Sequence, residues 1–177
     1  MRQYVTLPNL VTSGNLTAGF VALLAIPANL LQASVLIMIA AGFDSLDGMM
    51  ARRNPSKGSF GANLDSLADL VSFGVVPAMA LYLGLLHRLG VLGLAACLAF
   101  LLCGAWRLAR FPLTARPDWF VGLPIPPAGV LMMLLAVWGP PPILALLSTF
   151  TLGALMISTV PFPTLPGLRR SLRRYLK

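Results

Sequence analysis

Four aspartates lie close together in a chain that is otherwise almost free of acidic residues. The whole sequence holds five acidic side chains, all aspartates, and four of the five are Asp44, Asp47, Asp65 and Asp69. Carboxylate oxygens are the ligands that hard cations such as Mg²⁺ and Mn²⁺ prefer, and bound Mg²⁺ usually completes its shell with water and substrate phosphates. The cluster therefore indicates a metal site that handles a phosphate-bearing substrate.

The spacing of these acids predicts two helical faces. Residues three or four apart lie on one face of a helix, so Asp44 and Asp47 share one face and Asp65 and Asp69 share another. A turn at residues 54–59 would bring the two helices together antiparallel and side by side, with all four carboxylates facing one cleft. Like charges this close repel strongly at low dielectric, so cations between them are expected.

Small residues accompany the acids on the same faces. Gly48 and Ala51 follow the first pair, and Gly61 precedes the second pair by one helical turn. Because these positions carry little or no side chain, a planar ring or a phosphate group could approach the backbone there.

The composition places the chain in a membrane. Hydrophobic residues make up 58% of the sequence, charged residues only 10%, and the mean hydropathy is +0.85. Soluble domains have an apolar share of about 45 to 50%. Ionisable residues inside such a chain are expensive to bury and usually mark a functional site.

Segments long enough to cross a bilayer, which needs roughly 20 apolar residues per helix, can be counted along the sequence. We expect an all-α integral membrane protein with six transmembrane helices, formed as one domain over residues 1–177 with a basic C-terminal tail from about residue 161. The expected spans are 9–26, 30–52, 62–85, 90–110, 122–138 and 142–160.

The basic residues set the expected orientation. With six spans, every lysine and arginine except Arg88 falls on the side that holds both termini and the acid cluster. Basic residues in short loops accumulate on the cytoplasmic side, so the termini and the acids are expected there, in the cytoplasmic membrane of a prokaryote. The basic residues form no stripe with interleaved aromatics, which argues against a nucleic-acid partner.

Two other interpretations of the acids stay open from the residues alone. Aspartates near helix ends can simply cap helices or meet lipid headgroups. A cation transporter with an acidic site is the non-enzyme alternative, although transport sites usually lie near the bilayer midplane at interrupted helices. The acids here are expected at the ends of spans, beside basic residues.

The full pattern resembles a known signature. The residues Asp44-x2-Asp47-Gly48-x2-Ala51-Arg52-x8-Gly61-x3-Asp65-x3-Asp69 match that of the CDP-alcohol phosphatidyltransferase family at every position, with its spacing intact. The family is also described by six helices with the signature on the second and third. The resemblance implies transfer of a phosphatidyl group from CDP-diacylglycerol to a small alcohol, with release of CMP.

The resemblance also implies roles for individual residues. Asp44, Asp47 and Asp65 would hold Mg²⁺ or Mn²⁺, with two ions expected, and Asp69 would be the general base and a further metal contact. The expected CDP-lipid-binding residues are Gly48, Ala51, Arg52, Gly61, Asn9 and Thr12. A homodimer is also implied, and small residues such as Gly90, Gly93, Ala95 and Ala96 could support close helix packing.

Secondary motifs point to the acceptor. The opening at residues 7–15 and the stretch at residues 72–77 resemble the phosphatidylserine synthase branch of the family, which implies serine as acceptor. Arg107 and Arg110 would grip a phosphate or the serine carboxylate by bidentate bonds, or would serve only as cytoplasmic anchors. Pro112 stands where that branch is expected to carry an asparagine. Glycerol 3-phosphate, inositol phosphate and an archaeal-type lipid donor therefore stay open.

Overall fold

A helical bundle forms most of the protein. The computed structural model describes residues 5–53, 59–114 and 119–163. Its helices are α1 (Leu7–Ala25), α2 (Leu30–Arg53), α3 (Ser59–Asp69), the π-helical η2 (Leu70–Val75), α4 (Val76–Gly84), the 3₁₀ turn η3 (Leu86–Leu89), α5 (Val91–Thr114), α6 (Ile125–Trp138) and α7 (Pro142–Ile157).

Local signals explain where several helices begin and end. Thr6 caps α1 by accepting a hydrogen bond from the Asn9 amide, and a proline occupies the first turn. Prolines also occupy the first turns of α6 and α7. Gly139 ends α6 with a left-handed backbone (φ 68°), which glycine adopts without steric cost.

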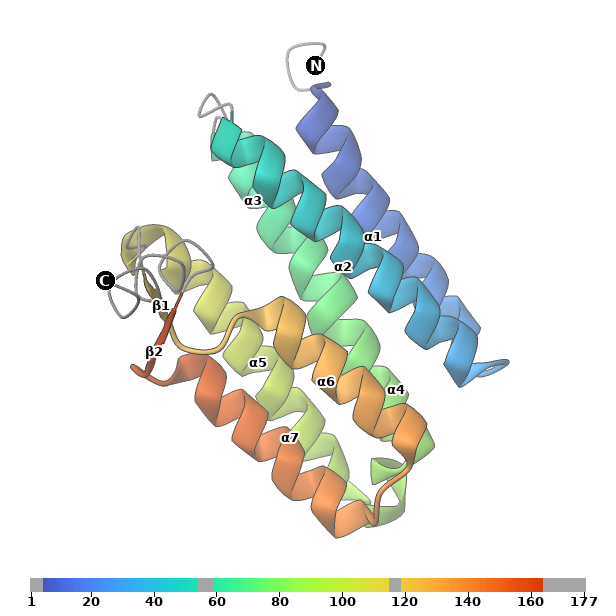
Figure 1. Cartoon of the computed structure of the whole chain (residues 1–177). Helices are drawn as coiled ribbons and strands as arrows, with labels where there is room; N and C mark the ends of the chain where they lie inside the picture. The colour runs from blue at the N-terminus through green and yellow to red at the C-terminus, as the bar shows by residue number, and fades with distance from the viewer. Residues whose placement is uncertain (1–4, 54–58, 115–118, 164–177) are drawn as a thin grey trace, which may run out of the picture.

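The helices pack as neighbouring layers (Figure 1). α1 packs along α2 and also contacts α3 and η2, while α4 packs on α6 and α5 packs on α7. The start of α1 lies at the same end of the bundle as the end of α2 and the start of α3, and η3 lies towards the opposite end (Figure 1). The acids of α2 and α3 are thus near the end at which the chain begins.

The apolar helices confirm a multi-pass membrane protein. Four described helical runs are long and apolar enough to cross a bilayer: Leu7–Ala25, Leu30–Met50, Phe60–Gly84 and Val91–Arg110. The helices α6 and α7 fall where the fifth and sixth spans are expected, but with 14 and 16 residues they are shorter than the roughly 20 that a span needs. Six spans therefore remain a prediction.

A short ladder departs from the all-helical expectation. Strand β1 (Trp119–Val121) pairs antiparallel with β2 (Pro161–Pro163), and Phe120 lies opposite Phe162. Proline lacks an amide hydrogen and is therefore confined to sheet edges and extended segments. The ladder, with a hydrogen bond from Gly122 N to Val160 O, satisfies main-chain groups where the chain leaves helical structure.

A wide helical turn follows the second acid pair. Pro77 cannot donate a hydrogen bond and would clash with the carbonyl four residues earlier, so the regular ladder cannot pass Phe73. The backbone instead forms η2, in which Val76 N–H bonds to Val71 O, five residues back. Ser72, Phe73 and Gly74 of this turn are buried, and Gly129 of α6 lies so close that an added Cβ would overlap the Phe73 main chain.

Two of the small residues expected to support a dimer have contacts within the chain. An added Cβ on Gly93 would overlap the Leu86 carbonyl of η3, and Ala96 is fully buried. Gly90 and Ala95 are exposed. A homodimer therefore stays a prediction, and Gly93 and Ala96 do not provide its surface.

The contact between α6 and η2 predicts a position-specific cost. Gly129→Ala should lower stability by about 1 to 3 kcal/mol, because the new methyl group meets backbone that cannot move aside cheaply. Gly42→Ala is the matched control, since an added Cβ there meets nothing within 4 Å and a helical alanine is favoured over glycine by up to about 1 kcal/mol. The thermal unfolding midpoints of the two variants are measured in detergent, and equal midpoints would contradict the close contact between Gly129 and the Phe73 main chain.

Candidate active site

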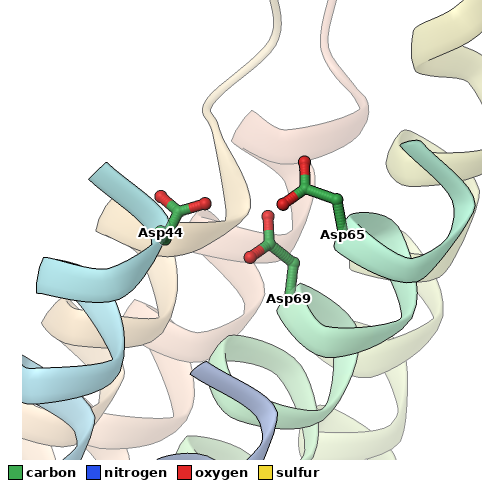
Figure 2. Close-up of side chains that lie close together, drawn as sticks. All are labelled: Asp44, Asp65 and Asp69. Atoms are coloured by element: carbon green, nitrogen blue, oxygen red, sulfur yellow. The ribbon is translucent and has the colours of Figure 1, made fainter. Parts of the chain in front are cut away.

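Three carboxylates from two helices converge. Asp44 projects from α2, and Asp65 and Asp69 project from α3 towards it (Figure 2). One carboxylate oxygen from each lies within 4.8 Å of the others. Asp69 is buried, and the other two are half-buried. The predicted faces of the two helices therefore do meet.

The fourth predicted acid lies outside this group of three. Asp47 is fully buried on α2, and its Oδ2 accepts a hydrogen bond from the Thr12 hydroxyl of α1. Among the described residues, Asp47 is not one of the three acids that converge. The helical spacing predicts Asp44 and Asp47 on one face, and in the structure only Asp44 joins Asp65 and Asp69, while Asp47 bonds to Thr12 of α1.

Helix α1 contributes more to the site than the sequence suggested. Thr12 and Asn15 lie three residues apart and are both buried. While Thr12 donates to Asp47, the Asn15 amide Nδ2 donates to Asp69 Oδ1 at 3.3 Å. Asn15 was not among the predicted site residues. The signal that could have found it is a second polar side chain on the same face of an apolar helix as Thr12.

The two arginines of α5 have different surroundings. Arg107 is buried, and its charge interacts with that of Asp69. Arg110 is half-buried, and its guanidinium nitrogens lie 3.5 Å from the carbonyl oxygens of Ile157 and Ser158, at the end of α7. Arg107 is thus close enough to Asp69 for their charges to interact, and Arg110 lies against the end of another helix.

The remaining predicted residues differ in how deeply they are buried. Gly48 is half-buried with open space where a Cβ would lie, which suits a group approaching the backbone. Gly61 is buried near the start of α3, and Asn9 is half-buried in the first turn of α1. Ala51 and Arg52 belong to α2, but their side chains lie outside the described residues.

The donor set fits a hard divalent cation. All three converging ligands are carboxylate oxygens, which Mg²⁺ and Mn²⁺ favour over nitrogen or sulfur. With metal–oxygen bonds of about 2.0 to 2.1 Å, ligands on one Mg²⁺ lie about 3 to 4 Å apart, so small side-chain adjustments would close the group of three on an ion. The arrangement can therefore hold a cation against a phosphate-bearing substrate.

Curated relatives from several prokaryotes resemble this chain over most of its length. A CDP-diacylglycerol–serine O-phosphatidyltransferase of Methanocaldococcus jannaschii is 38% identical over 94% of this chain and 78% of its own. The enzyme of that name from Bacillus subtilis is 35% identical over 89% of both chains. An archaetidylserine synthase of Methanothermobacter thermautotrophicus is 36% identical over 95% of this chain and 74% of its own.

The family model agrees with these relatives. The model for CDP-alcohol phosphatidyltransferase matches residues 5–162, which include the whole acid signature and the helices from α1 to α7. With this match and the converging acids of α2 and α3, the chain belongs to the CDP-alcohol phosphatidyltransferase family.

Proposed function

We propose that this protein transfers a phosphatidyl group from CDP-diacylglycerol to the hydroxyl of serine, forming phosphatidylserine and releasing CMP. The observation that carries the proposal is the convergence of Asp44, Asp65 and Asp69 from two helices in a chain of this family. Serine appears in the names of the bacterial and archaeal relatives alike, whereas the lipid in those names differs. The acceptor is therefore better supported than the lipid of the donor.

The reaction needs one proton acceptor. The serine hydroxyl oxygen forms a bond to the lipid-side phosphorus of CDP-diacylglycerol, and the bond from that phosphorus to the oxygen of CMP breaks, with the electron pair leaving on CMP. Asp69 takes the hydroxyl proton. A positioned base contributes roughly 10²- to 10⁴-fold in rate, and Asp69 is the most deeply buried of the three converging acids.

Divalent cations are the proposed cofactors. The family depends on divalent metals, and we assign two ions, Mg²⁺ or Mn²⁺, to Asp44, Asp47, Asp65 and Asp69. Bound there, they would neutralise charge on the diphosphate and on the leaving oxygen. Asp47 accepts a hydrogen bond from Thr12 of α1, and in this proposal it also takes part in metal binding.

Substrate contacts follow from the positions around the acids. Gly48, Ala51 and Gly61 would give the cytidine and phosphates room, and Arg52, Asn9 and Thr12 would help hold the CDP-lipid. Arg107, buried and close enough to interact with Asp69, is suited to bind the serine carboxylate. Arg110 would complete that pair when it leaves the end of α7.

We further propose six spans with both termini and the active site facing the cytoplasm, in the inner membrane of a prokaryote. At that boundary the acyl chains stay in lipid while the nucleotide and serine arrive from water. The domain would extend over the full chain, residues 1–177, and its basic tail lies mostly outside the described residues. A homodimer is part of this proposal, and nucleic acid is not a partner.

The acceptor and metal requirements can be tested together. Purified protein with CDP-diacylglycerol and Mg²⁺ or Mn²⁺ should release CMP with serine and not with glycerol 3-phosphate, inositol phosphate or choline. Excess EDTA should abolish CMP release, because the clustered carboxylates need cations to bind the diphosphate, and added Mg²⁺ or Mn²⁺ should restore it. Comparing CMP release from CDP-diacylglycerol with that from a CDP-activated ether lipid with isoprenoid chains shows which lipid donor the protein uses.

Turnover with a different acceptor would overturn the serine assignment. Full turnover in excess chelator would contradict the metal assignment. It would favour the alternative function, a cation transporter with an acidic site, for which cation flux into liposomes is the direct measurement.

Changing each acid to asparagine should affect substrate binding and turnover differently. Asp44→Asn, Asp47→Asn and Asp65→Asn should weaken CDP-diacylglycerol binding, because an amide is a poorer ligand for the hard cations that hold the diphosphate. Asp69→Asn should keep most of that affinity while turnover falls by at least about 10²-fold, because the lost function is proton removal. Calorimetry and CMP release separate these effects. Near-native turnover of Asp69→Asn would mean that the base lies elsewhere.

The proposed orientation makes a prediction about the C-terminus. If α6 and α7 both cross the bilayer, a reporter fused after Lys177 should be cytoplasmic, and one inserted at the η3 turn beside Arg88 should face outside. A C-terminal reporter found outside would show that one of the two short helices does not cross.

A further inference from the structure

Asn15 contacts Asp69 from a helix that carries none of the signature acids. Its Nδ2 donates to Asp69 Oδ1 at 3.3 Å, and the Asn15 side chain is fully buried. An ionised carboxylate can only accept hydrogen bonds, so the amide must present its NH₂ group to Asp69. Among the residues that the structure describes, Asn15 Oδ1 has no hydrogen-bond partner. A buried acceptor without a partner lowers stability, so packing alone does not account for an asparagine at this position.

The main chain of Asn15 is fixed as well. Ser72 Oγ of η2 donates to Asn15 O at 3.2 Å. One turn further along α1, Gly19 lies so close to Ser72 that an added Cβ would overlap the serine hydroxyl. Because α1 is seated directly on the turn that follows Asp69, the amide of Asn15 cannot move far from the carboxylate.

Several charged groups act on the Asp69 carboxylate. Asp44 and Asp65 lie beside it and repel its negative charge, while Arg107 attracts it. Without a further restraint, the carboxylate would rotate in response to these charges. The Asn15 hydrogen bond restrains one of the two carboxylate oxygens, Oδ1.

We propose that Asn15 is a positioning residue that sets the orientation of the Asp69 carboxylate for proton removal from the acceptor. This inference rests on the proposed role of Asp69 as general base. Thr12 holds Asp47 from the same face of α1, so this one helix restrains an acid of α2 and an acid of α3.

The test uses Asn15→Leu, which has a similar side-chain volume and removes both the donor and the unpartnered oxygen. The turnover number for CMP release should fall about 10- to 100-fold, the usual cost of removing a group that orients a catalytic or metal-binding residue. The affinity for CDP-diacylglycerol and the KM for serine should stay unchanged. The thermal midpoint in detergent should change little, because loss of the hydrogen bond to Asp69 is offset by removal of a buried acceptor that has no partner.

A matched control lies on the same helix. Thr17 is exposed, and its hydroxyl bonds only to Ser13 O among the described contacts, so Thr17→Val should keep wild-type turnover. If Asn15→Leu does not fold, Asn15→Ser replaces it, because the serine hydroxyl is too short to reach Asp69 while the smaller side chain is easily accommodated.

A double-mutant cycle gives the decisive comparison. If Asn15 acts through Asp69, Asn15→Leu should cause no further loss of turnover in an Asp69→Asn background. An equal loss in both backgrounds, unchanged turnover of Asn15→Leu, or a turnover loss that only parallels a lower thermal midpoint would each overturn the inference. Near-native turnover of Asp69→Asn would instead remove the base assignment itself, so the two failures are distinguishable.

Discussion

Repulsion between carboxylates in an apolar bundle is the constraint on which the rest of this structure depends. Carboxylate oxygens of Asp44, Asp65 and Asp69 are brought within 4.8 Å of one another in a chain that carries only two other acidic residues. Such a cluster is costly unless opposite charge and hydrogen-bond donors offset it. Arg107 and Asn15 supply part of that offset from α5 and α1, and bound cations would supply the remainder. The helices that pack around α3 therefore supply the groups that make the close approach of these carboxylates possible.

Much of the fold was visible in the sequence because apolar length and helical spacing are local properties. Runs of apolar residues ending at proline or glycine gave the helices close to their observed bounds, and spacings of three and four placed Asp65 and Asp69 on one face. The ladder between β1 and β2 was missed because its partners are about 40 residues apart and two of the residues are prolines. Such pairing depends on how α6 and α7 pack, which no local pattern encodes.

The acids of the site could be predicted from the sequence, but the residues that contact and orient them could not. The signature identified the acids, yet whether Asp47 faces its neighbours or α1 depends on the contact with Thr12, a residue 35 positions away. The same holds for Asn15, which contacts Asp69 across 54 positions. Arg107 and Arg110 look equivalent in sequence, and only the packing of α5 buries Arg107 and places Arg110 against Ser158 at the end of α7.

The shortness of α6 and α7 has a consequence for the surrounding lipid. At 1.5 Å per residue, the 14 residues of α6 rise about 21 Å, against a hydrocarbon core of about 30 Å. Where such helices cross a bilayer, the membrane thins beside them or their flanking residues reach towards the interface. With the active site at the proposed membrane boundary, thinning on this side would draw headgroups inward and shorten the path by which a lipid diphosphate reaches the acids. Turnover would then depend on membrane thickness, and lipids with longer chains would slow the enzyme although its site residues are unchanged.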